Sequence, residues 1–333
     1  MRKFVITAGF LIFLFSPWVS GRDKADEINP EIQRALELSD IRHSKMPPFH
    51  LSATVAVTVK GKAPLKGKYV LLKNSDGDWR EELTLPGFSR LRVGDEHNYW
   101  QVRTAEYNPL PIQNIDELLD FPGQLNIEKK RKFTKPSKTK KDGAELFCQH
   151  AKEDPIHEET VCFDPSGGEL IFRDNGLSNF QSAGRVSSEQ FSDFQGIGAK
   201  RFPTSLRGFN EKKLLVDIHV DELKEAPDLD SNLFTAPAGA LRWLFCPLKL
   251  KNRISPDYPQ ASRNRHEQGV VTFYGIIGVD GKVSKLFLLQ SAGAVLDKSS
   301  TAAVYQWVYE QSLCDGVPGP VETTIDVTFT LEQ

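Results

Sequence analysis

Hydrophobic and polar residues alternate along much of the chain with a period of two. Between Leu51 and Val59 apolar residues occupy every second position. A period of two places successive side chains on opposite faces of a strand, so the run predicts a half-buried β-strand. Turn residues such as Pro86-Gly87 favour an antiparallel meander. The same pattern predicts strands at Lys68–Lys73, Trp79–Leu85, Ser89–Val93, Asn98–Val102, Glu145–His150, Glu158–Phe163, Glu169–Asp174, Lys200–Leu206 and Lys213–Leu223.

Two segments in this β-rich region have helical spacing instead. Apolar residues recur every three to four positions in Pro30–Arg42 and in Ile112–Phe121, which predicts two short helices. A polar, Pro-rich stretch at 227–239 then leads out of the region. We therefore expect two folded units, residues 22–240 and residues 241–333.

The last ninety residues predict a helix–strand–strand–helix–strand unit. Asp280-Gly281 is a strong hairpin signal between two strand-like runs, Val270–Val279 and Val283–Gln290. One helix is expected at Gln260–Glu267. Leu296, Ser300, Ala303 and Trp307 share one face of a second.

The final strand alternates cleanly, which predicts one buried face and one solvent-exposed face. The expected buried face holds Val321, Thr323, Ile325, Val327, Phe329 and Leu331, and the expected exposed face holds Glu322, Thr324, Asp326, Thr328 and Thr330. Two helices over the sheet would bury Trp307 against Phe273, Phe287 and Phe329.

The amino terminus has the pattern of a secretory signal peptide. Arg2 and Lys3 precede an apolar run, and small or β-branched residues stand at Val19 and Gly21. We expect cleavage after Gly21 and export to the periplasm. The alternative is an uncleaved inner-membrane anchor, but the apolar run is shorter than the roughly 20 residues that span a bilayer.

The composition argues against several classes of function. The chain has 39% hydrophobic and 26% charged residues and a formal charge of −2, so it lacks the basic surface that nucleic-acid binding requires. Phosphate-binding loops, zinc-protease spacing and the Gly-x-Ser-x-Gly elbow are all missing. We therefore predict no catalytic residues, no cofactor and no resident metal. A hydrolase without a recognisable motif is a weak alternative.

The four cysteines would mature in an oxidising compartment after export. A hairpin centred on Pro155 places Cys148 opposite Cys162, within disulfide distance. Cys246 would then pair with Cys314. A zinc site made of Cys148, His150, His157 and Cys162 is the alternative.

Eight basic residues lie between Lys129 and Lys141. They favour a solvated hairpin loop, because Pro136, Ser137 and Thr139 interrupt the run. The alternative is a surface that binds anionic lipid headgroups.

The C-terminal motifs resemble the TonB carboxyl-terminal domain family. The resemblance is carried by Tyr258-Pro259, Asp280-Gly281, Leu296-Asp297, Trp307 and the terminal strand. It implies that a partner segment adds as a strand beside Val321, Thr323, Ile325, Val327 and Phe329, because an open sheet edge offers unpaired N–H and C=O groups. The expected partner is an outer-membrane or periplasmic protein. A protected edge or a dimer seam is the alternative, and the oligomeric state is not predicted.

The region before it more weakly resembles the LolA-like lipoprotein carriers. The meander with Trp79, Phe88 and Trp100 and the late run from Phe202 to Pro237 carry this resemblance. It implies an α+β fold, in which an antiparallel half-barrel with helices precedes the small C-terminal unit. It also implies an alternative function, a periplasmic lipid or lipoprotein carrier with an apolar cavity.

Overall fold

The computed structural model describes residues 30–42, 45–59, 61, 63–120, 134–141, 143–152, 158–176, 184–244, 248–314 and 316–331. The expected signal peptide, residues 1–21, lies outside these residues. Among the described helices, none is both long and apolar enough to cross a bilayer.

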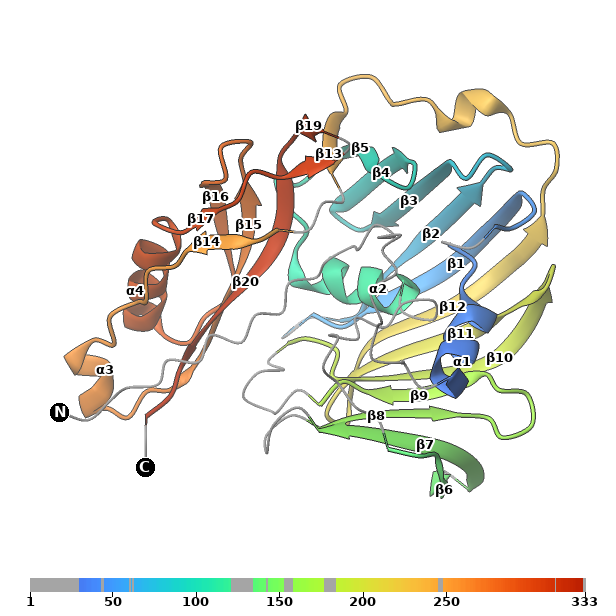
Figure 1. Cartoon of the computed structure of the whole chain (residues 1–333), viewed down its shortest axis with the longest axis horizontal. Helices are drawn as coiled ribbons and strands as arrows, with labels where there is room; N and C mark the ends of the chain where they lie inside the picture. Colours follow the sequence, from blue (N-terminus) through green and yellow to red (C-terminus); the bar gives the residue numbers. More distant parts are fainter. Residues whose placement is uncertain are drawn as a thin grey trace.

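A large antiparallel sheet forms most of the molecule. Its strand order is β13-β5-β4-β3-β2-β1-β12-β11-β10-β9-β8-β7-β6, and the end strands do not pair with each other, so this sheet of described strands is open. It curves around helices α1 and α2 (Figure 1). The strands are β1 Phe49–Val57, β2 Leu65–Lys73, β3 Trp79–Leu85, β4 Phe88–Gly94, β5 Asn98–Arg103, β6 Ser137–Lys141, β7 Ala144–Lys152, β8 Glu158–Phe163, β9 Leu170–Asp174, β10 Ser188–Ile197, β11 Lys200–Asn210, β12 Lys213–Glu225 and β13 Leu241–Leu244.

The two helices cover the inner face of this sheet. Helix α1 spans Pro30–Ser39 and packs on β9 and β11, and α2 spans Leu110–Asp120 and packs on β1, β11 and β12. Their apolar residues, including Ile32, Ile115 and Leu118, join one core with the alternating residues of the strands. Apolar and polar residues alternate in these strands because every second side chain packs against the helices. A short 3-10 helix, η2 Ser231–Phe234, follows β12.

The C-terminal unit has the predicted αββαβ order. Helix α3 (Gln260–Asn264) is followed by β15 (Gly269–Ile277), β16 (Val283–Gln290), α4 (Ala294–Val304) and β20 (Val321–Phe329), and the sheet order is β16-β15-β20. Gly281 at the hairpin has φ +75°, and a Cβ there would meet the Tyr309 carbonyl oxygen at 2.1 Å. Short strands complete the unit: β14 Leu250–Asn252, β17 Val308–Tyr309, β18 Leu313–Cys314 and β19 Val317–Pro318.

The α+β prediction is confirmed, with an open antiparallel sheet, inner helices and a small C-terminal unit. Strand β10 was missed because its apolar residues Phe191 and Phe194 are three positions apart. Asp193, between paired Ser192 and Phe194, has a left-handed φ of 57°, and the register with β11 is the same on both sides of it. Phe191 is buried in the core, and Phe194 packs against that core. Strand β13 pairs with β5 of the large sheet, and its last residue, Leu244, packs in the apolar core of the C-terminal unit. This segment therefore connects the two units.

Candidate functional site

The expected binding strand, β20, lies at one end of the small sheet. It pairs with β15 over nine residues, from Val321 opposite Ile277 to Phe329 opposite Gly269. Among the described residues no strand pairs with its other edge. The backbone of β20 is therefore hydrogen-bonded to strands of the described chain on one side only.

The five predicted partner-binding residues all lie on one face of β20, as expected. Val321, Ile325, Val327 and Phe329 pack with Trp307 in an apolar core, and Thr323 is also buried. Trp307 donates its indole N–H to the Ile254 carbonyl at 2.8 Å. These side chains anchor the strand from inside its own unit, so only the backbone of β20 is left to meet a partner.

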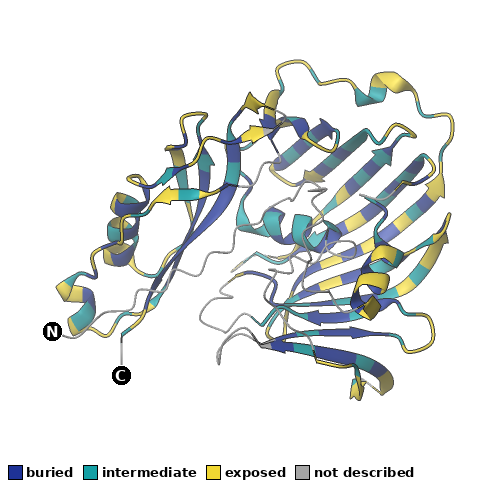
Figure 2. Ribbon diagram, in the orientation of Figure 1, coloured by how far each residue is buried: buried dark blue, intermediate teal, exposed yellow. Residues whose placement is uncertain are grey.

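The prediction that the other face of β20 is solvent-exposed is wrong. Eight of the nine residues of β20 are at most 8% exposed, and the strand is dark blue along most of its length in Figure 2. Thr324, Asp326 and Thr328 are buried. The cause is tertiary: the α2 region and the Arg103 and Arg185 segments of the large unit cover this face.

Two ion pairs hold the covered face of β20 against the large unit. Asp326 binds Arg185 through two hydrogen bonds of 2.7 Å and accepts a third from Thr272 at 2.8 Å. Glu322 pairs with Arg103 at 2.6 Å, with both side chains 7% exposed. The bidentate match between the Asp326 carboxylate and the Arg185 guanidinium fixes orientation as well as distance.

Aromatic rings surround the Arg103–Glu322 pair. The Arg103 guanidinium lies 5.7 Å from the centre of the Trp243 ring and 5.8 Å from that of Tyr274. Burial, together with the negative charge of Glu322, raises the pKa of the Tyr274 phenol well above its usual value. The phenol therefore stays protonated. On α2, Gln113 accepts a hydrogen bond from Thr324 at 2.9 Å.

Phe287 corrects a second prediction. It lies on the face of β16 away from Trp307 and stacks on Tyr107 of the large unit, with ring centres 4.5 Å apart. Phe273 and Phe329 do share the core with Trp307. Irregular pairing between β15 and β16 at Thr272/Phe273 and Ile276/Ile277 changed the side-chain alternation, which a strict period of two could not anticipate.

The Cys148–Cys162 disulfide is confirmed, because the two residues are opposite each other on β7 and β8. Both sulfurs are used in this bond, so the proposed zinc site with His150 is excluded. His150 Nδ1 instead lies 2.9 Å from the Thr160 hydroxyl. Cys246 and His157 lie outside the described residues, so the Cys246–Cys314 bond stays a prediction.

The described part of the basic segment forms an edge strand. Ser137–Lys141 is β6, the last strand of the large sheet, and it is mostly exposed. Lys138 pairs with Glu145 at 2.8 Å, and the Lys141 ammonium lies over the Phe172 ring at 3.3 Å from its centre. Lys129, Lys130, Arg131 and Lys132 lie outside the described residues.

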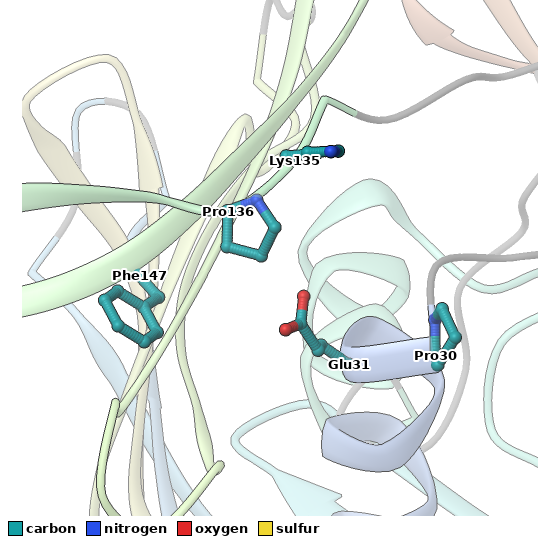
Figure 3. A pocket seen from close by; sticks show the side chains of 5 residues that line it. All are labelled: Pro30, Glu31, Lys135, Pro136 and Phe147. Atoms are coloured by element: carbon teal, nitrogen blue, oxygen red, sulfur yellow. The ribbon is translucent and has the colours of Figure 1, made fainter.

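A pocket of about 530 Å³ opens between the start of α1 and the chain leading into β6 (Figure 3). Pro30, Glu31, Lys135, Pro136 and Phe147 line it. Glu31 accepts a hydrogen bond from Gln149 at 3.0 Å. The lining combines apolar rings with one acidic and one basic side chain.

The large unit also buries charges that the sequence did not reveal. Glu81 lies 2.6 Å from both Arg42 and Arg90. Burial alone would raise the pKa of Glu81, but the charges of Arg90, Arg42 and Arg92 outweigh it and hold this pKa well below its usual range. Across the described residues, no group of three or more His, Cys, Asp or Glu side chains could hold a metal ion.

Arg103, Arg185 and Gln113 are the residues of this site that sequence reasoning missed. Each contacts β20 from more than 140 positions away in the chain. They have no motif and no characteristic spacing, so no sequence signal marked them.

The overall fold of this chain is only weakly similar to solved structures. A LolA superfamily protein from Nitrosomonas europaea has a TM-score of 0.40 and 12% identity over 62% of this chain and 96% of that chain. A Pseudomonas aeruginosa MucA/MucB complex has a TM-score of 0.29 and 11% identity over 90% of this chain and 93% of that chain.

Sequence comparisons concern the C-terminal unit. The Vibrio cholerae protein TonB is 32% identical over 87 residues, which are 26% of this chain and 36% of that protein, so the chain spans about a third of this relative. Residues 254–331 match the family described as Gram-negative bacterial TonB protein C-terminal. The family likeness predicted from the terminal motifs is thus confirmed, and residues 254–331 carry it.

Proposed function

We propose that this chain is a non-enzymatic periplasmic protein whose C-terminal unit binds a protein partner by strand addition at β20. The observation that supports it is the outer edge of β20, to which no strand of the described chain is paired. An unpaired edge presents N–H and C=O groups in the direction of the next strand. The match of residues 254–331 to the TonB carboxyl-terminal family supports the same proposal.

The side chains of β20 would have a supporting role in such binding. Val321, Ile325, Val327 and Phe329 are held in the core, and Asp326 is held by Arg185. A partner strand would therefore approach in the plane of the sheet and bind backbone groups, while the fixed side chains hold the edge in place. Thr323 is buried on the same face as the core residues.

Hydrogen exchange tests this proposal without altering the protein. The probes are short peptides copied from the segments by which outer-membrane receptors contact TonB. We expect saturable binding and slower amide exchange within Val321–Phe329. Binding that leaves these amides unchanged, or no binding at millimolar peptide, would reject strand addition at β20.

A pair of proline variants provides an independent test. Thr323→Pro removes an N–H within β20, whereas Thr330→Pro alters an exposed position just after the strand. We expect only the first to abolish peptide binding, provided circular dichroism shows that both are folded. If Thr323→Pro is unfolded, the exchange experiment decides alone.

Export is part of the same proposal. Cleavage of residues 1–21 would leave a mature chain that begins at Arg22, in a compartment where the Cys148–Cys162 disulfide persists. Intact mass after expression in a Gram-negative host tests this directly. An uncleaved chain in the membrane fraction would favour the anchored alternative.

A lipid or lipoprotein carrier is the second candidate, and the pocket beside Pro30 is the observation that favours it. Phe147 and Pro136 offer apolar surface, and Lys135 could meet an anionic headgroup. Lipid extraction followed by mass spectrometry of the purified protein tests this function. We expect stoichiometric lipid if the carrier function is correct, and Phe147→Asp should remove it.

A further inference from the structure

The two edges of the small sheet differ sharply in accessibility. β20 is covered on both faces, by its own core and by the large unit. On β16, at the opposite edge, only Val283 is fully buried. No described strand pairs with the outer edge of β16 either. Both edges of this sheet are unpaired among the described strands, but only β16 also leaves several of its side chains exposed for a partner to contact.

The composition of β16 is unusual for an exposed edge. Leu286, Phe287, Leu288 and Leu289 are consecutive, and Leu288 is 45% exposed. Natural edges are usually protected by charges, prolines or bulges, because an open apolar edge recruits other strands. The pairing irregularities with β15 leave a regular stretch from Lys285 to Leu288, and Lys285 is the only charged residue of the strand.

Exposed apolar side chains are concentrated in the same unit. Of the ten large hydrophobic residues that are exposed in the described chain, eight lie within residues 241–331. They include Leu288 on β16 and Val295, 37% exposed, at the start of α4, which packs against β15 and β16. Leu288 and Val295 thus leave apolar side chains accessible to a partner on β16 and α4.

Side chains from the large unit flank the other side of β16. Tyr107 stacks on Phe287, and the Glu106 carboxylate lies 3.7 Å from the Lys285 ammonium. Glu106 is 69% exposed, so this surface ion pair is weak and another carboxylate can replace it. The Lys285 ammonium is therefore available to an acidic group that arrives along the strand.

We propose that the outer edge of β16, between Lys285 and Leu288, receives an extended segment of a partner protein that alternates apolar and polar residues and carries a carboxylate opposite Lys285. Apolar side chains of that segment would lie toward Leu288 and Val295, and its carboxylate would replace Glu106 at Lys285. The site is separate from β20, because β15 lies between the two strands. Two partners could therefore bind the same sheet at once.

The test uses the full chain and two capped eight-residue peptides that alternate valine and threonine. One peptide has an aspartate at a central threonine position, and the other has a lysine there. We expect the aspartate peptide to bind more tightly by fluorescence anisotropy and to slow amide exchange within Val283–Gln290. Protection confined to Val321–Phe329, or no saturable binding, would overturn the β16 proposal; the first result would leave strand addition at β20 intact.

Charge reversal tests the role of Lys285. Lys285→Glu should weaken binding of the aspartate peptide by about fivefold and strengthen binding of the lysine peptide by a similar factor. Glu106→Gln should strengthen binding of the aspartate peptide by about twofold, because it removes the competing carboxylate. An unchanged preference between the peptides would overturn the proposed role of Lys285.

A matched pair of surface variants tests the apolar contact. Leu288→Asp should weaken binding of the aspartate peptide by about tenfold. Leu214→Asp is the control, because Leu214 is 37% exposed on β12 of the large sheet, away from β16. Equal loss in both variants would show a nonspecific effect and would overturn the placement of the peptide over Leu288.

Discussion

The large unit and the C-terminal unit bury their charged residues in different places. In the large unit, Glu81, Arg90, Arg173 and Glu189 lie buried inside the curved sheet region. In the C-terminal unit the core around Trp307 is apolar, and the charges of β20 are directed outward to the large unit.

The two units therefore differ in the interactions that specify their folds. The C-terminal core depends on local apolar periodicity, which a sequence displays directly. The large unit depends in addition on ion pairs between strands far apart in the chain, and such pairs are strongly destabilising when one partner is lost. The following variants test the comparison.

The largest effect is expected from Trp307→Ala. It would leave a cavity in the C-terminal core and remove the hydrogen bond to the Ile254 carbonyl, at a cost of about 4 kcal/mol in the free energy of unfolding. Trp307→Phe should cost less than half as much. Chemical denaturation followed by circular dichroism measures both, and a loss below about 1 kcal/mol for the alanine variant would contradict an apolar core centred on this ring.

Glu81→Gln tests whether the large unit depends on its buried charges. The change removes the negative charge between Arg42 and Arg90, and we expect a loss of about 3 kcal/mol at pH 7. Because the pKa of Glu81 is depressed, its contribution is present above the unfolded value of 4.5 and is lost as the pH falls below it. The control is Glu145→Gln on the exposed Lys138 pair, which should change stability by less than about 0.5 kcal/mol.

Asp326→Asn tests the junction between the two units. It leaves the Arg185 charge buried without its carboxylate, so we expect a loss of about 2 kcal/mol. Combining Arg185→Met with Asp326→Leu should recover part of this loss, because no buried charge then remains. A double-mutant cycle by thermal unfolding measures the coupling, and additive effects would show that the pair does not hold the units together.

An effect similar in size to that of Asp326→Asn, but of opposite sign, is expected from Glu189→Gln at alkaline pH. Burial raises the pKa of Glu189 to about 8, despite the attraction of Arg173, whose nearest guanidinium nitrogen is 3.7 Å away. Burial likewise raises the pKa of Glu117 to about 7.

A raised carboxyl pKa means that the folded protein holds protons that the unfolded chain releases. The stability of the unaltered protein should therefore fall as the pH rises from about 4.5 to about 8. Glu189→Gln should reduce this slope and be more stable than the unaltered protein by roughly 2 kcal/mol at pH 9. Urea unfolding at pH 5, 7 and 9 measures the free energy of unfolding of both proteins. An equal dependence on pH in both would show that Glu189 does not titrate in this range.

Much of the fold could be predicted because its signals are local. Strands such as Trp79–Leu85 and Glu158–Phe163 were predicted with their observed bounds, and the Cys148–Cys162 bond follows from a hairpin centred on Pro155. Strand β10 was missed because Phe191 and Phe194, which both contact the core, are three positions apart and break the period of two. Phe287 was assigned to the wrong face because the pairing of β15 with β16 is irregular.

The local pattern of residues is enough to predict the elements of the C-terminal unit and which side chains of β20 share a face. What covers the other face depends on how the two units pack together. Glu322, Thr324 and Asp326 look like exposed strand residues, because alternation describes the side chains of one strand and contains no information about a neighbouring unit. Arg103, Gln113 and Arg185 reach them from distant parts of the chain, and their contacts exist only once both units are folded.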